Sequence, residues 1–139
     1  MRESRAVFFA LALVSSISWA EDFDYSVMSR AETQRIDNMV ARNMSSLDDP
    51  CLYIEILDPE NNWSPIRKKS ICALDGRSLI SDFTYASFSN VKFSPGGLQA
   101  DLTLIPLQAV IEDVLHCSIK LMDDEIGSLE CSQGHEGYY

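Results

Sequence analysis

Residues 94–105 read Ser-Pro-Gly-Gly-Leu-Gln-Ala-Asp-Leu-Thr-Leu-Ile. The Pro-Gly-Gly segment is a turn signal, because proline presets the backbone for a turn and glycine adopts the left-handed conformations that turns need. After it, apolar and polar residues alternate up to position 105, which is the pattern of a strand with one buried face. The preceding segment 83–93 is rich in aromatic and β-branched residues. We therefore predict a β-hairpin over residues 83–105.

The same period of two recurs on both sides of this hairpin. Residues 51–57 alternate, and after a polar loop the segment 66–73 can return beside them as a second strand. Asp75-Gly76 marks the next turn. Farther along, 117–121 and 128–132 read as strands around the turn at 123–127. Residues 108–114 are ambiguous between a strand and a short helix.

The segment before these strands predicts a helix. Ser29 and Glu32 form a Ser-x-x-Glu capping box, and a helix is expected from there to about residue 46. Asp48-Asp49-Pro50 ends it, because proline cannot continue a helix. One stripe at helical spacing can pack on a sheet; it consists of Ile36, Met39, Val40 and Leu47. An alternative use of this segment is an adaptable docking surface made by its methionines, namely Met28, Met39 and Met44.

These elements predict an α+β fold. One N-terminal helix packs on a mostly antiparallel sheet of about six strands in hairpin order. The length favours a single domain over residues 21–139. We find no internal repeat or linker that would divide it.

The first twenty residues indicate export. Arg2 and Arg5 precede an apolar run over 6–18 that is too short to span a bilayer, and small residues at 18 and 20 fit a signal-peptidase site. We expect residues 1–20 to be a signal peptide and the mature chain to begin near Glu21. No later run has membrane-spanning length, so no membrane insertion is expected after cleavage. The protein should be periplasmic or secreted.

All four cysteines lie after the signal. In an oxidising compartment an even number of cysteines indicates disulfides, and three pairings are possible. We favour Cys51 with Cys72 and Cys117 with Cys131, because each pair brackets a predicted hairpin and closes a short loop. A zinc site made of the four thiolates is the alternative, but neither Cys-x-x-Cys nor a nearby histidine pair occurs. We expect no metal ligands.

The chain is strongly acidic, with 21 Asp and Glu against 11 Lys and Arg and a net charge of −10. Such a field repels nucleic acid and speeds encounters with basic proteins. The alternative is that the acidity serves solubility alone.

Little in the sequence indicates catalysis. There are two histidines, His116 and His135, and neither has a carboxylate or a second histidine beside it in sequence to orient the ring. No Gly-x-Ser-x-Gly pattern occurs, and the cysteines are assigned to disulfides. We therefore expect a protein that is not an enzyme and holds no cofactor. A calcium site in the acidic loops is an alternative, although neither loop has the ligand order of an EF-hand.

The strongest candidate for a binding residue is Trp63, which lies in a polar loop instead of an alternating strand. Tryptophan is enriched at interface hot spots, because it buries a large rigid area and keeps one donor. The alternative is that Trp63 folds back over the sheet edge. The predicted partner-binding residues are Asp58, Glu60, Asn61, Asn62 and Trp63, together with Asp123, Asp124 and Glu125.

An export signal, a small disulfide-linked domain, strong acidity and the lack of a catalytic set together resemble the profile of bacterial periplasmic inhibitors and immunity proteins. The resemblance is one of type and rests on no diagnostic motif. It implies an acidic binding protein that blocks a basic partner, such as a peptidoglycan hydrolase or a toxin. The alternative function is a non-enzymatic accessory or structural domain of the cell envelope or a secretion assembly.

Overall fold

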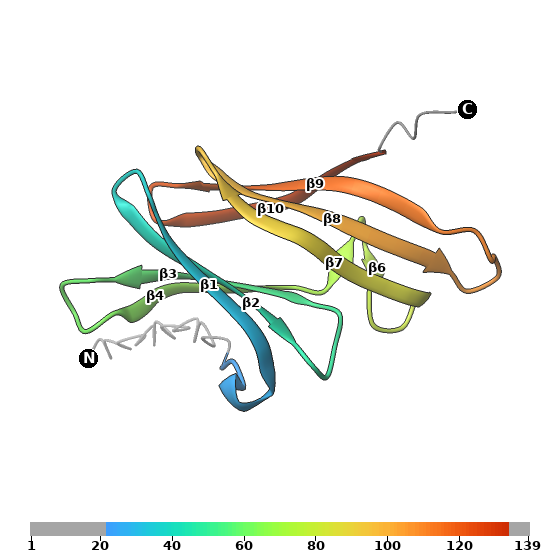
Figure 1. The fold of residues 1–139 in the computed structure, drawn as a ribbon, viewed down its shortest axis with the longest axis horizontal. Helices are drawn as coiled ribbons and strands as arrows, with labels where there is room; N and C mark the ends of the chain where they lie inside the picture. Colours follow the sequence, from blue (N-terminus) through green and yellow to red (C-terminus); the bar gives the residue numbers. More distant parts are fainter. Residues whose placement is uncertain (1–21, 134–139) are drawn as a thin grey trace, which may run out of the picture.

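The computed structural model describes residues 22–133, which form two four-stranded antiparallel sheets lying as separate layers (Figure 1). The first sheet contains, in spatial order, β1 (Met28–Ile36), β2 (Met39–Ser46), β3 (Leu52–Asp58) and β4 (Ser64–Ile71). The second contains β7 (Phe83–Ser94), β8 (Gly97–Pro106), β9 (Asp113–Met122) and β10 (Glu125–Gln133). A short hairpin of β5 (Ala73–Leu74) and β6 (Arg77–Ser78) connects the two sheets in the chain. The predicted signal peptide lies outside the described residues.

The predicted α+β fold is wrong. The structure is nearly all β, and the described residues include no helix of seven residues or more, only a single helical turn at Tyr25–Val27. The segment expected to be one helix is the hairpin of β1 and β2, with Ile36 paired to Met39 across the turn. Ser29 does not cap a helix; its hydroxyl donates to the carbonyl of Ser45 on the neighbouring strand.

The physical reason lies in β2, which is the second strand of its sheet and is buried on both faces. Met39, Val40 and Ala41 are consecutive and all buried, so the strand shows no alternation of apolar and polar residues. Ladders to β1 and β3 satisfy its backbone and override the helical propensity of the local residues. The burial of Met39 and Met44 also removes the proposed methionine docking surface.

Two of the predicted hairpins are confirmed. β7 and β8 pair around the Pro95-Gly96 turn, and β3 pairs with β4. Residues 108–112 belong to neither a strand nor a helix. Both disulfides have the favoured pairing: Cys51–Cys72 closes the open end of the β3–β4 hairpin, and Cys117–Cys131 joins directly opposed residues of β9 and β10. Each is expected to add about 2–4 kcal/mol of stability.

The main core fills the space between the sheets. Side chains from alternate positions of both sheets make one cluster, as expected for two layers packed face to face. From the first sheet it takes Ile36, Met39, Ala41, Leu52, Ile54, Ile56 and Ile71, and from the second Val91, Phe93, Leu98, Ala100, Ile119 and Leu121. Asn43 shares the inward parity of Ala41 and is fully buried, with no hydrogen-bond partner for its side-chain amide within the described residues.

Two cations of the first sheet hold the edge strands of the second. Arg30 on β1 donates to the carbonyl of Val91 at 2.9 Å, and Lys69 on β4 donates to the carbonyl of Gly127 at 2.9 Å. Both carbonyls belong to residues that lie inside irregularities of β7 and β10, where the ladder register shifts. The two layers are therefore tied together at both of their long edges.

The outer face of the first sheet contains a buried ion pair. Glu55 is fully buried and accepts from Nε and Nη2 of Arg42, its cross-strand neighbour, at 3.0 and 2.7 Å. The hydroxyl of Tyr25 donates to the second oxygen of the same carboxylate at 2.6 Å. Phe23 packs edge-on against Tyr25 and Tyr53. The described N-terminal residues are thus fixed across this face. No helix within residues 22–133 is long and apolar enough to cross a membrane.

Candidate functional site

The two segments predicted to bind a partner lie at the same end of the molecule. The turns of the hairpins β1–β2, β3–β4, β7–β8 and β9–β10 all project at one end, which we call the turn end (Figure 1). Arg67 of β4 and Glu125 of β10 form an exposed ion pair of 3.6 Å between the sheets near this end. The backbone N–H of Asp124 donates to the sulfur of Met39, at 3.3 Å, and this joins the β9–β10 turn to the β1–β2 hairpin.

Two consecutive turns form the β3–β4 loop. In the first, the Asp58 carboxylate accepts from the backbone N–H of Glu60 at 3.0 Å, which is the Asx turn typical of aspartate. In the second, the N–H and hydroxyl of Ser64 both donate to the carbonyl of Asn61, at 3.0 and 2.6 Å. The two residues between them, Asn62 and Trp63, have φ of 53° and 59°. Positive φ at both central positions is the mark of a type I′ hairpin turn.

Trp63 occupies an unusual backbone position. The second central residue of a type I′ turn is normally glycine, because a side chain in the left-handed region is crowded by its own backbone. A bulky residue there is an outlier, and such conformations cluster at functional sites. The Trp63 side chain is 55% exposed, so a large rigid apolar surface remains in solvent at the tip of the loop.

The β9–β10 turn repeats the geometry with acidic residues. Asp123 and Asp124 stand between the paired residues Met122 and Glu125 and have φ of 53° and 58°. Both carboxylates are exposed. The turn end therefore combines one exposed tryptophan with acids from several hairpins, namely Asp37, Asp58, Glu60, Asp123, Asp124 and Glu125.

The acids of the turn end do not converge on a point. Within residues 22–133, no group of three or more His, Cys, Asp or Glu side chains is placed to hold a metal ion. One oxygen of Asp58 is already used by the Glu60 N–H. The arrangement fits a group of exposed acids around a protruding aromatic ring, with Arg67 paired to Glu125 beside them, better than a cation site.

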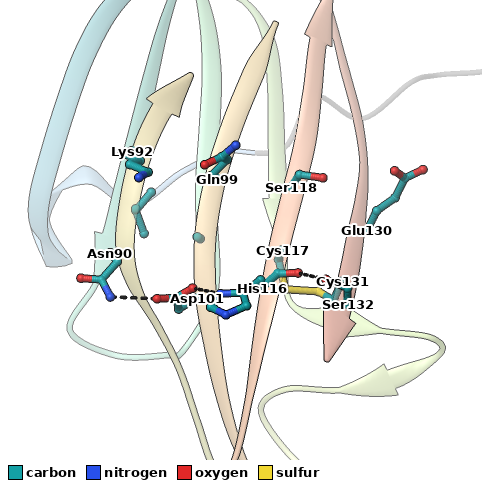
Figure 2. A pocket seen from close by; sticks show the side chains of 12 residues that line it. Asn90, Lys92, Gln99, Asp101, His116, Cys117, Ser118, Glu130, Cys131 and Ser132 are labelled. Atoms are coloured by element: carbon teal, nitrogen blue, oxygen red, sulfur yellow. Dashed lines mark hydrogen bonds and ion pairs between the residues drawn. A yellow bond between two sulfur atoms is a disulfide. The ribbon is translucent and has the colours of Figure 1, made fainter. Parts of the chain in front are cut away.

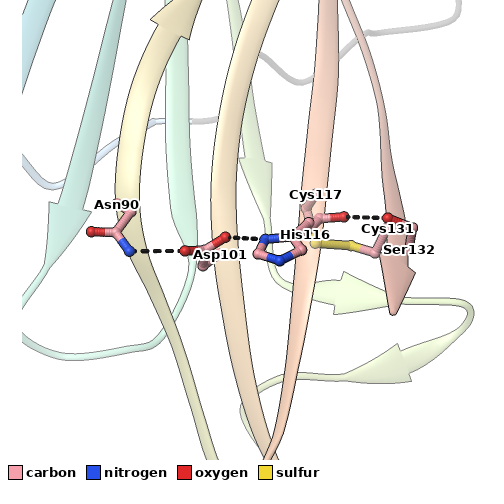
Figure 3. Close-up of polar contacts among 6 residues, drawn as sticks. All are labelled: Asn90, Asp101, His116, Cys117, Cys131 and Ser132. Atoms are coloured by element: carbon pink, nitrogen blue, oxygen red, sulfur yellow. Dashed lines mark hydrogen bonds and ion pairs between the residues drawn. A yellow bond between two sulfur atoms is a disulfide. The ribbon is translucent and has the colours of Figure 1, made fainter. Parts of the chain in front are cut away.

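Sequence reasoning missed a second polar surface, on the outer face of the second sheet. A concavity of about 910 Å³ crosses all four strands there (Figure 2). At its centre His116 Nδ1 lies 2.6 Å from Asp101 Oδ1, and Asn90 Nδ2 donates to Asp101 Oδ2 at 2.8 Å (Figure 3). Hydrogen bonds from Asn90 first, and then from His116, lower the pKa of the Asp101 carboxyl below its usual 3.8.

His116 therefore does have an orienting carboxylate, but the partner comes from another strand. Asp101 is paired with His116 in the β8–β9 register, fifteen positions away in sequence. The alternation along β8 and β9 indicates which side chains of each strand share a face. The register that pairs Asp101 with His116 depends on residues far apart in sequence, so it cannot be inferred from either strand alone. His135 lies outside the described residues.

The same register places Ser132 on the other side of His116, so that Ser, His and Asp stand side by side on three strands. These are the residue types of a catalytic triad, but the geometry differs. The Ser132 hydroxyl donates to the backbone carbonyl of His116 at 3.4 Å, and the imidazole is turned toward Asp101 (Figure 3). A triad requires the serine hydroxyl to reach the second ring nitrogen. The observed arrangement does not connect a nucleophile to its base.

Comparisons with known proteins find no relative. No protein-family model, no curated protein and no solved structure matches this chain. The functional argument therefore rests on the geometry of the two surfaces.

Proposed function

We propose that this chain is an exported acidic binding protein that docks on a basic protein partner through its turn end. Trp63 is the observation that carries the proposal. A tryptophan kept in a left-handed turn position has an unfavourable backbone geometry, and the fold buries less than half of its surface. Insertion into a cleft of a partner would give this side chain the burial that the fold does not supply.

The acids around Trp63 supply the second part of the argument. Exposed carboxylates of the β3–β4 and β9–β10 turns face outward, and their field accelerates the approach of a positively charged protein. Exposed charges add little to affinity by themselves, whereas a desolvated aromatic anchor adds much. Charge would thus guide the encounter, and Trp63 would hold the complex.

The class of partner follows from the compartment. The two disulfides indicate an oxidising environment, either extracellular or periplasmic. A basic protein with an open cleft in such a place fits a peptidoglycan hydrolase or a toxin. We therefore propose an inhibitor or immunity protein, one that blocks the partner without catalysis of its own.

The decisive variant is Trp63→Gly. Glycine removes the aromatic anchor and is also the preferred residue at this turn position, so we expect binding to weaken at least tenfold while the protein becomes more stable by about 1 kcal/mol. The measurement is capture of basic hydrolases on the immobilised mature protein, followed by dissociation constants and hydrolase assays. Leu47→Ala removes another exposed apolar side chain, on the β2–β3 connection at the opposite end, and should change neither property.

A matched pair of charge variants tests the steering. Asp123→Asn with Asp124→Asn removes two charges at the turn end, and asparagine tolerates positive φ. Glu112→Gln with Asp113→Asn removes two charges at the far end, where the β8–β9 connection meets the start of β9 (Figure 1). At low salt the first pair should slow association several-fold more than the second, and added salt should remove the difference.

Two results would contradict the proposal. A captured partner whose affinity is unchanged in Trp63→Gly would remove the β3–β4 loop from the interface. Capture of envelope or secretion components that resist high salt, with no hydrolase inhibited, would instead favour the accessory role and leave the acidity to solubility alone.

A further inference from the structure

The outer face of the second sheet carries its polar side chains in two aligned rows. In the first row, the ladder pairs Lys92 with Gln99, Gln99 with Ser118, and Ser118 with Glu130, so that each strand contributes one residue. The second row consists of Asn90, Asp101, His116 and Ser132. The rows are two residues apart along each strand, which is about 7 Å. Figure 2 shows both rows lining the same concavity.

An irregularity of the backbone completes the second row. Asn90 has φ of 51° and lies where the β7–β8 register shifts, between Ser89 and Lys92. Bulges of this kind redirect a side chain, and they are frequent beside functional sites. Here the bulge aims the Asn90 amide at Asp101, which also binds His116. One carboxylate thus fixes an amide and an imidazole before any ligand arrives, which lowers the entropic cost of binding.

The chemistry of the rows selects the class of ligand. One lysine and one histidine stand against two carboxylates, so the surface does not favour a polyanion. The side chains that point outward in both rows are polar and none is a phenylalanine, tyrosine or tryptophan, so a lipid or an apolar ligand gains few side-chain contacts here. Amides, hydroxyls and an imidazole offer both donors and acceptors, and neighbouring strands space them about 4.8 Å apart. A neutral oligosaccharide carries hydroxyl groups on every sugar unit, so it can form hydrogen bonds with each strand in turn.

We propose that this face binds a neutral oligosaccharide chain, laid across the four strands over a span of about 14 Å. Gln99 and Ser118 contact the chain in the middle of the first row. Asp101 acts through Asn90 and His116, which it positions for contact in the second row. The site is separate from the turn end and does not depend on the identity of the protein partner.

The test is a titration of the mature, oxidised protein with chitotetraose and with cellotetraose, followed by ¹⁵N–¹H NMR. We expect at least one of them, at millimolar concentration, to shift backbone signals of β7–β10 and the side-chain amides of Asn90 and Gln99. Gln99→Ala with Ser118→Ala should weaken that binding about threefold to tenfold for each hydrogen bond lost, and Asp101→Asn should weaken it by a similar factor. The matched control is Thr33→Ala with Gln34→Ala, two exposed polar residues of β1 on the other sheet.

Three outcomes would overturn the proposal. The first is the absence of shifts on this face with both oligosaccharides. The second is tighter binding of a sulfated oligosaccharide than of the neutral ones, because it would show a site for anions. The third is a set of shifts confined to Trp63 and its loop, which would place saccharide binding at the turn end. None of these results depends on whether the turn end binds a basic protein.

Discussion

The two sheets have the same strand arrangement but use their outer faces in opposite ways. On the first sheet, the outer face buries Glu55 completely and holds it with Arg42 and Tyr25. On the second, the outer face leaves His116 and its neighbours in solvent, around a concavity. The comparison teaches that an outer face covered by the chain's own N-terminal residues is closed to solvent, whereas an outer face without such a cover keeps its rows of polar side chains accessible.

The largest effect should come from Arg42→Ala in the first sheet. The Glu55 carboxylate would lose both hydrogen bonds from Arg42 and keep the one from the Tyr25 hydroxyl, and a buried charge that loses its bonded counterion destabilises a protein by about 3–5 kcal/mol. Urea unfolding measures the loss. Arg35→Ala, an exposed arginine on β1, is the control and should change stability by less than about 0.5 kcal/mol. Equal losses in the two variants would show that the ion pair is not structural.

A smaller effect of opposite sign is expected inside the first sheet, at Asn43. Its amide nitrogen and oxygen are buried, and neither has a partner within the described residues. Asn43→Leu keeps the branching at Cγ and removes the unsatisfied groups, so stability should rise by about 1–3 kcal/mol, less the cost of packing a larger side chain. Gln34→Leu, at an exposed position of the edge strand β1, controls for added hydrophobicity. A fall in melting temperature for Asn43→Leu would show that the amide is hydrogen-bonded in solution.

The two faces should also differ in their response to pH, beginning with the alkaline side. Burial, followed by the hydrogen bond to Glu55, raises the pKa of Tyr25 above its usual 10.0. The stability that the protonated Tyr25 hydroxyl contributes is complete below pH 10 and is lost as the pH rises through the raised pKa. Because Tyr25 is 46% exposed, solvent screening limits the effect to about 1 kcal/mol or less. Tyr25→Phe should flatten the alkaline limb of a stability–pH profile, whereas Tyr85→Phe, an exposed tyrosine of β7, should leave it unchanged.

The smallest effect belongs to the second sheet on the acid side. The pKa of Asp101 is lowered, so its contribution is present above pH 3.8 and is lost as the pH falls through the lowered value. The carboxylate is 24% exposed and its partner His116 is 62% exposed, which keeps the expected contribution below about 1 kcal/mol. Asp101→Asn should therefore flatten only the acid limb. A loss above 2 kcal/mol would mean that this face has a structural role like that of the first sheet.

The same contrast explains which parts of the fold could be predicted. β8 and β9 each have one solvent-exposed face, so apolar and polar residues alternate along them and the strands can be recognised in the sequence. The turns at Asp75-Gly76 and Pro95-Gly96 can be predicted from their residue types. β2 is buried on both faces and β1 has few apolar residues, so neither has a readable period. The Asp37-Asn38 turn between them was the available signal, and a pattern of helix formers obscured it.

Of the two candidate sites, one could be predicted from the sequence and the other could not. A tryptophan in a polar loop is visible in sequence, so the β3–β4 segment was found, although its left-handed backbone was not. The row of Asp101, His116 and Ser132 was missed because it depends on the pairing of three strands, which no local pattern encodes. The alternation of residues along one strand shows which side chains share a face, but the pairing register between strands decides which of them become neighbours in a site.

The contacts of Arg30 and Lys69 have a consequence for behaviour at high concentration. An open sheet edge is a template on which a foreign strand can grow, and growth needs consecutive free carbonyls along the edge. On β7 and β10, one carbonyl in each irregular segment is turned to the facing sheet and occupied by a cation. A second chain therefore meets an interrupted edge on both sides of this sheet. These two long side chains thus oppose the addition of a foreign strand at the edges of the second sheet.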